Sequence, residues 1–196
     1  ATDHFSARCR VENRLLGLLP LLFFGARLVE LTSQGKAAHI LWICHTSNLL
    51  IALGIFLCQI EFVRISVLWL IIGIPLWPFD ILRTGVIEIT SIGTHYLGLL
   101  VGLLVLKQHK MGKHSWAYAL IWYLFLQQIA RIFSPAELNV NLAHAAYPGW
   151  DKIFPDYWQY WLFITGCAAL SLWIISKLFS WVSEKFSLAK GFSSGG

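Results

Sequence analysis

Side chains with catalytic potential cluster in two apolar stretches of the sequence. They comprise Cys44, His45, Thr46 and Asn48 in an early stretch, and Glu88, Ser91 and His95 in a later one. In a helix, the spacing of Glu88, Ser91 and His95 (i, i+3, i+7) places all three on one face. Polar groups at membrane depth are costly unless they face one another or a wet cavity. Together with the polar residues at the end of a third apolar stretch, 115–133, the two stretches predict a polar pocket between three helices.

The chemistry that suits these groups is nucleophilic acyl transfer. A thiol at Cys44 or a hydroxyl at Thr46 would attack an ester carbonyl, and His95 would act as general base. Glu88 or Asp80 would orient the imidazole. The supporting side chains, which would orient groups or stabilise an oxyanion, are His45, Asn48, Ser91, Asn139, Asn141 and His144.

Each of these groups also has a purely structural interpretation. Cys44 would serve as a small buried apolar residue, and Asp80 would pair with Arg83 at the interface. Glu88 would be a solvated acid at the start of a helix. The chain contains no G-x-S-x-G or H-E-x-x-H motif and no metal-ligand spacing, so the sequence predicts no metal site. The catalytic hypothesis depends on the convergence of several groups.

The elements that position these side chains must be membrane helices. Of the 196 residues, 57% are hydrophobic and only 13% are charged, with a mean hydropathy of +0.65. Soluble domains carry roughly 25% charged residues. A small soluble domain could not bury so much apolar surface. We therefore expect an all-α, polytopic transmembrane helical bundle.

Six apolar stretches are long enough, or nearly so, to cross the hydrocarbon core. The expected spans are about 14–32, 39–60, 62–79, 86–106, 115–133 and 157–180, in one domain over 1–190 followed by a flexible tail at 191–196. The first span is the weakest, because Pro20, Arg27 and Glu30 interrupt it. With six spans, ten of the 15 Lys and Arg residues fall on the side of the termini. This excess predicts that both termini are cytoplasmic.

The expected topology gathers the polar groups in one leaflet. Cys44, Glu88 and His95 then lie near the extracytoplasmic ends of their helices. The connection 134–156, of about 23 residues, is longer than most loops, and such loops often cover binding sites. We expect it to roof the pocket.

The order of these segments resembles the androgen-induced-gene-like membrane lipid hydrolases and, more loosely, the YwaF-like integral membrane proteins. The resemblance covers about 39–150. In such families a Thr or Cys near the start of an early helix works with a His on a later helix. Here the segments 42–48 and 91–95 stand at those places, followed by the basic turn 107–114 and the run 146–150. Thr46 would match the hydrolases, and Cys44 the YwaF-like proteins.

Three functions are compatible with this pattern. The first is an integral membrane lipid ester hydrolase or acyltransferase, with membrane lipids as substrates and no cofactor. The second is an accessory subunit of a larger membrane complex, with a pigment or haem ligated by His45 or His95. The third is a small transporter. The net charge of +5 does not indicate nucleic-acid binding, because the basic residues lie in short connections between spans.

Overall fold

The computed structural model describes residues 11–85, 88–107 and 109–193, and these residues form helices and connections without a strand. The longer helices are α2 (Val11–Ser33), α3 (Ile43–Phe56), α4 (Ile60–Thr84), α6 (Gly98–Leu106), α7 (Ser115–Phe133) and α8 (Tyr157–Ser193). The shorter ones are η1 (Ala37–Leu41), α5 (Ile89–Ile92), η2 (Gly93–Leu97), η3 (Ala136–Leu138) and η4 (Val140–Leu142). The expectation of an all-α fold is confirmed for this part of the chain.

Among the described residues, four helices are long and apolar enough to cross a membrane: Arg14–Ser33, Ile60–Phe79, Ile89–Leu106 and Tyr157–Lys185. The helix α3 is apolar but has only 14 residues. It covers about 21 Å, which is less than the ~30 Å of a hydrocarbon core. The last turns of α7 contain Gln127, Gln128 and Arg131, which lower its hydropathy.

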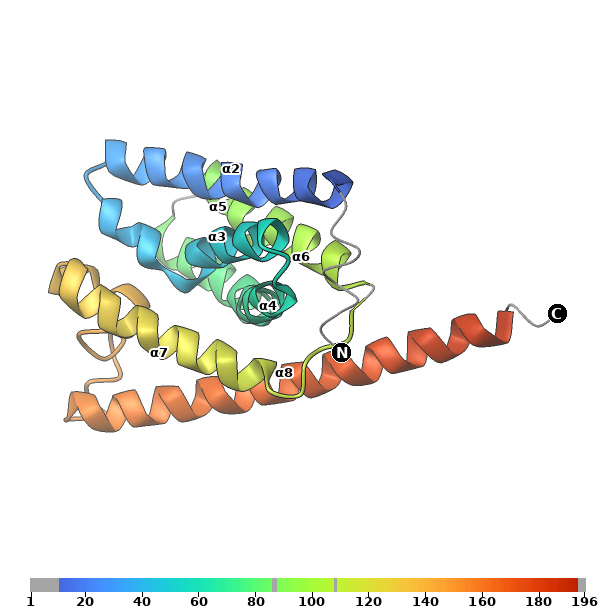
Figure 1. The fold of residues 1–196 in the computed structure, drawn as a ribbon. Helices are drawn as coiled ribbons and strands as arrows, with labels where there is room; N and C mark the ends of the chain where they lie inside the picture. Colours follow the sequence, from blue (N-terminus) through green and yellow to red (C-terminus); the bar gives the residue numbers. More distant parts are fainter. Residues whose placement is uncertain (1–10, 86–87, 108, 194–196) are drawn as a thin grey trace.

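The helix α4 is the central element of the bundle. It packs against α3, α6, α7 and α8. Its buried side chains include Val63, Val67, Leu68 and Leu70, all with 0% exposure. Figure 1 shows α2 and α8 on opposite sides of the bundle, with α8 lying beside α7 and continuing past the other helices. The core therefore lies around α4, and α2 closes the side on which the polar cluster forms.

The helix α4 is longer than the expected span 62–79. It continues through Pro75 and Pro78 and ends at Thr84, and the next residue, Gly85, has a left-handed φ of 69°. A proline removes one N–H donor and the hydrogen bond to residue i−4, but the flanking turns of α4 remain helical. Glycine then ends the helix without strain. Asp80 therefore lies in the last turns of α4 and not in the connection after it, and its side chain is outside the described part of the structure.

The helix α8 extends beyond the expected span 157–180. It has 37 residues and reaches Ser193. Residues 191–193 of the expected flexible tail are thus helical in this structure, and residues 194–196 lie outside the described ranges.

Three elements in series form one continuous helix from Ile89 to Leu106. The residues at both junctions of η2, Gly93 and Gly98, have right-handed helical backbone angles. The middle element η2 is a π-helical turn that contains His95. A π-turn changes the carbonyl pairing pattern and often occurs at functional sites.

The start of this π-turn is held against α3 by Asn48. This side chain is fully buried, and its Nδ2 donates to the carbonyl oxygens of Cys44 (3.1 Å) and Thr94 (2.8 Å). A Cβ added at Gly98 would lie well inside van der Waals distance of Asn48 Oδ1. The two helices can approach this closely because residue 98 has no side chain.

Replacement of Gly98 with alanine should therefore destabilise the protein. We expect the free energy of unfolding to fall by about 1–3 kcal/mol because the new methyl group displaces a buried amide. Gly166→Ala is the matched control, since a Cβ there would meet no described atom within 4 Å. It should be neutral or stabilising by up to about 1 kcal/mol. Unfolding followed by circular dichroism in detergent tests both, and equal stability of the two variants would contradict the close approach.

Candidate functional site

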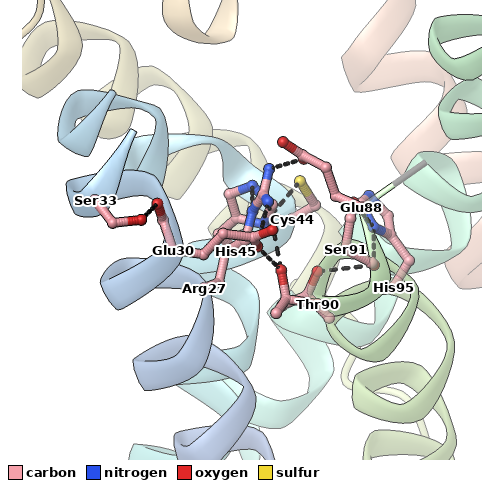
Figure 2. A network of polar contacts seen from close by, with 10 residues as sticks. Arg27, Glu30, Ser33, Cys44, His45, Glu88, Thr90, Ser91 and His95 are labelled. Carbon is pink, nitrogen blue, oxygen red and sulfur yellow. Dashed lines mark hydrogen bonds and ion pairs between the residues drawn. The ribbon is translucent and has the colours of Figure 1, made fainter. Parts of the chain in front are cut away.

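Arg27 on α2 lies at the centre of a buried polar cluster. Its exposure is only 5%. Its Nε donates to His45 Nε2 at 3.4 Å, and one terminal nitrogen pairs with Glu30 at 2.8 Å and contacts Thr90 Oγ1 at 3.4 Å. The other terminal nitrogen pairs with Glu88. Thr90 in turn donates to Glu30, so that one guanidinium joins α2, α3 and the start of α5 (Figure 2).

Two histidines and a thiol adjoin this arginine. The Sγ atom of Cys44 lies 3.7 Å from Nδ1 of His45. The ring of His95 is edge-on to that of His45, with 6.2 Å between centroids. The His95 ring also stacks on Trp77 of α4, with 5.3 Å between the ring centroids and an interplanar angle of 25°. The His95 Nδ1 atom lies 2.8 Å from the carbonyl oxygen of Ser91.

The contact with Ser91 defines the protonation of neutral His95. A carbonyl oxygen can only accept, so Nδ1 carries the proton and donates it. The other ring nitrogen, Nε2, then has the lone pair and is the basic atom of the ring. Because the ring also stacks on Trp77, its orientation is fixed from two sides.

The long connection after α7 holds the first turn of α3. Asn141 of η4 accepts a hydrogen bond from the backbone N–H of Ile43 (2.9 Å) and donates to the carbonyl of Leu41 (2.8 Å). The backbone carbonyl oxygen of Asn141 accepts hydrogen bonds from Tyr123 and Gln127 of α7. The start of α3, which carries the thiol, is thus tied to α7 through one asparagine.

Charge in the cluster is not balanced. One guanidinium faces two carboxylates, Glu30 and Glu88, whose side chains are 28% and 25% exposed, whereas the side chain of Arg27 is 6% exposed. The cluster therefore reaches the protein surface at its two carboxylates. Exposed apolar side chains stand beside them, namely Val29 on α2 and Ile89 on α5.

The structure brings together most of the residues expected in the pocket. Those present in the cluster or in contact with it are Cys44, His45, Asn48, Glu88, Ser91 and His95. The hydroxyl of Thr46 instead donates to the carbonyl oxygens of Trp42 (3.3 Å) and Ile43 (3.2 Å) in its own helix.

The remaining expected residues make contacts within the loop. The side chain of Asn139 accepts from the N–H groups of His144 and Ala145, and it donates to the carbonyl of Ala145. The Nε2 atom of His144 is buried without a hydrogen-bond partner among the described residues. These contacts organise the loop, and none of them joins it to Arg27 or His95.

Four members of the cluster were not expected from the sequence: Arg27, Glu30, Trp77 and Thr90. Arg27 and Glu30 counted only as interruptions of the first span. Charged residues inside an apolar helix usually face protein and pair with one another. Their spacing of i, i+3 within an apolar stretch was the signal that could have identified them.

No known protein-family model, curated protein or solved structure matches this chain. Within residues 11–85, 88–107 and 109–193, no group of three or more His, Cys, Asp or Glu side chains is arranged to hold a metal ion. The function is therefore argued from the geometry of the cluster.

Proposed function

We propose that the protein is an integral membrane enzyme that transfers the acyl group of a lipid ester through Cys44, either to water or to an acceptor alcohol. The observation that carries this proposal is the contact of Cys44 Sγ with a histidine nitrogen at 3.7 Å inside a buried polar cluster. A second histidine with a defined basic nitrogen stands beside the first. A thiol, a base and fixed hydrogen-bond donors are the parts that acyl transfer requires.

The reaction would proceed through a thioester. The thiol proton of Cys44 passes to Nε2 of His95, and the sulfur forms a bond with the ester carbonyl carbon. The tetrahedral intermediate then collapses, the carbon–oxygen bond to the lipid alcohol breaks, and the leaving oxygen takes the proton from His95. Water or a second lipid alcohol attacks the thioester, giving its proton to His95 and restoring the thiol. No external oxidant or reductant is consumed.

Cys44 is a better nucleophile in this arrangement than Thr46. The Thr46 hydroxyl donates its proton to carbonyl oxygens of the same helix, and no described histidine nitrogen accepts it. A thiol also ionises more readily than a hydroxyl. This choice agrees with the resemblance to the YwaF-like proteins.

The surroundings suit a substrate that arrives from the bilayer. Val29 is 70% exposed and Ile89 is 83% exposed, and both lie next to carboxylates of the cluster. In a membrane these apolar side chains face acyl chains. A lipid ester could therefore place its carbonyl near Cys44 while its chain remains in hydrocarbon.

The test is hydrolysis of lipid esters by the purified protein in vesicles. We expect turnover to fall by about 100-fold or more in His95→Gln, because general base catalysis contributes about 10²–10⁴. Ser47→Ala is the control, since the hydroxyl of this buried serine of α3 donates to the carbonyl of Ile43 in the same helix and contacts no described histidine. It should retain nearly full turnover. Full activity of His95→Gln would overturn the proposal.

We also propose six membrane crossings with both termini in the cytoplasm. The short α3 follows η1, and the two together occupy residues 37–56. The buried Gln127 of α7 has its hydrogen-bond partners inside the protein, namely Tyr123, Asn141 and Trp161. The exposed lysines between α6 and α7 lie at the end opposite the polar cluster, as a cytoplasmic turn requires.

Cysteines introduced at two exposed positions test this orientation. We expect Ala145→Cys to react with a membrane-impermeant maleimide in intact cells, and Lys113→Cys to react only after lysis. Peptide mapping separates the new sites from the native cysteines. The reverse pattern would show that the orientation is inverted, and labelling of both in intact cells would contradict the six crossings.

A further inference from the structure

The donors of Arg27 are almost fully used inside the protein. Its four contacts, with His45, Glu30, Thr90 and Glu88, use four of its five N–H groups. The side chain is also 6% exposed. An arginine in this state has little capacity left to bind a substrate phosphate or carboxylate, so its role lies in what it does to its neighbours.

The contact with His45 determines which nitrogen of that histidine carries the proton. The Nε atom of arginine is always a donor, so Nε2 of His45 must accept. A proton on Nε2 would make both facing nitrogens donors, and no hydrogen bond could form between them. The neutral ring therefore carries its proton on Nδ1, the nitrogen that faces Cys44 Sγ at 3.7 Å.

We propose that Arg27 is a positioning residue that holds His45 in the tautomer whose Nδ1–H group donates to the sulfur of Cys44. This inference rests on the proposed function, because it assigns a purpose to the hydrogen bond in an acyl-transfer reaction. A donor aimed at the sulfur stabilises the negative charge that develops there when His95 takes the proton. The two histidines thus have different roles: His45 donates, and His95 is the base.

The geometry also explains why this position requires arginine. The planar guanidinium contacts His45 through Nε while its two terminal nitrogens pair with Glu30 and Glu88. Lysine has a single ammonium and could pair with a carboxylate, but it has no second donor fixed in the direction of His45. Arg27→Lys therefore preserves the charge and removes the tautomer control.

The first test is the ¹⁵N NMR spectrum of protein with labelled histidine rings in bilayers, in which His45→Gln assigns the signals of His45. We expect a protonated Nδ1 and an unprotonated Nε2 in the wild type. In Arg27→Lys the Nε2–H form should become populated. A wild-type His45 with its proton on Nε2 would overturn the inference, whether or not any variant folds.

The second test is the rate at which N-ethylmaleimide alkylates Cys44, followed by peptide mapping. We expect Arg27→Lys to react about tenfold or more slowly than the wild type, which corresponds to loss of one hydrogen bond to a charged group. Arg64→Lys makes the same change in the ion pair with Glu61, outside the polar cluster, and should react at close to the wild-type rate. An unchanged rate in a folded Arg27→Lys protein would also overturn the inference.

The two proposals fail in different ways. If His45 has the expected tautomer and alkylation depends on Arg27, but lipid esters are not turned over, the proposed reaction is wrong while the role of Arg27 in orienting His45 stands. If lipid esters are turned over and depend on Cys44, but the tautomer does not depend on Arg27, only the positioning role is wrong.

Discussion

Replacement of Cys44 with alanine should abolish acyl transfer and leave the protein folded. Loss of the nucleophile removes the covalent step, so we expect turnover of lipid esters to fall by about 10³-fold or more. The Cys44 side chain is small and only partly buried where it packs against the core, so circular dichroism and thermal unfolding should change little. Steady-state turnover in vesicles is the measurement.

Two further variants show whether the loss is specific. Thr46→Ala removes only hydrogen bonds to carbonyl oxygens of its own helix and should keep most of the activity. Cys167→Ala removes an exposed thiol on α8 and should have no effect. If Thr46→Ala is inactive and Cys44→Ala is active, the threonine is the nucleophile, and the resemblance to the lipid hydrolases is the better guide.

Replacement of Arg27 with alanine should have the largest effect on stability. It leaves Glu30 and Glu88 without their cation and His45 without a donor. Removing one partner of a fully buried ion pair typically costs about 3–5 kcal/mol. The two carboxylates left behind here are partly exposed, so water screens part of their charge. We therefore expect the free energy of unfolding to fall by about 2–4 kcal/mol, measured by thermal or chemical unfolding in detergent.

A compensated variant separates charge from packing. Combining Arg27→Met with Glu30→Gln and Glu88→Gln removes the cation and both anions while keeping similar volumes. Replacing an entire buried ion network by neutral side chains is often close to neutral. We expect most of the lost stability to return. A triple variant as unstable as Arg27→Ala would mean that unpaired charge is not the cause of the instability of Arg27→Ala.

Most of the fold could be predicted because hydropathy marks membrane helices directly. The expected stretches 115–133 and 157–180 coincide with α7 and with the first part of α8. The end of α4 could not be predicted in the same way, because the expected span stopped at residue 79. The helix contains Pro75 and Pro78, continues past that point and ends at Thr84.

The polar cluster could be predicted only in part. Cys44, His45, Glu88 and His95 were expected in one pocket because spacing and topology placed them at the same end of neighbouring helices. The pairing of Arg27 with Glu88 joins residues 61 positions apart, and spacing along one helix contains no information about such a contact.

The orientation of His95 was also beyond the sequence pattern. The spacing of Glu88, Ser91 and His95 assumed a regular α-helix, but His95 lies in the π-turn η2, and Glu88 is the non-helical residue just before α5. A π-turn widens the helix locally and changes the face on which later side chains lie. A single π-turn does not change the hydrophobic periodicity of a short apolar stretch, so the sequence pattern does not reveal it.

Acyl transfer through Cys44 requires that this residue carries the acyl group during the reaction. The most direct measurement is to incubate the protein in vesicles with a glycerolipid whose acyl chain bears an alkyne, and to locate the bound chain by mass spectrometry. We predict an acyl adduct on Cys44 that neutral hydroxylamine releases, as expected for a thioester, and that is greatly reduced in His95→Gln. An adduct on another residue, or no adduct during measurable turnover, would contradict the account.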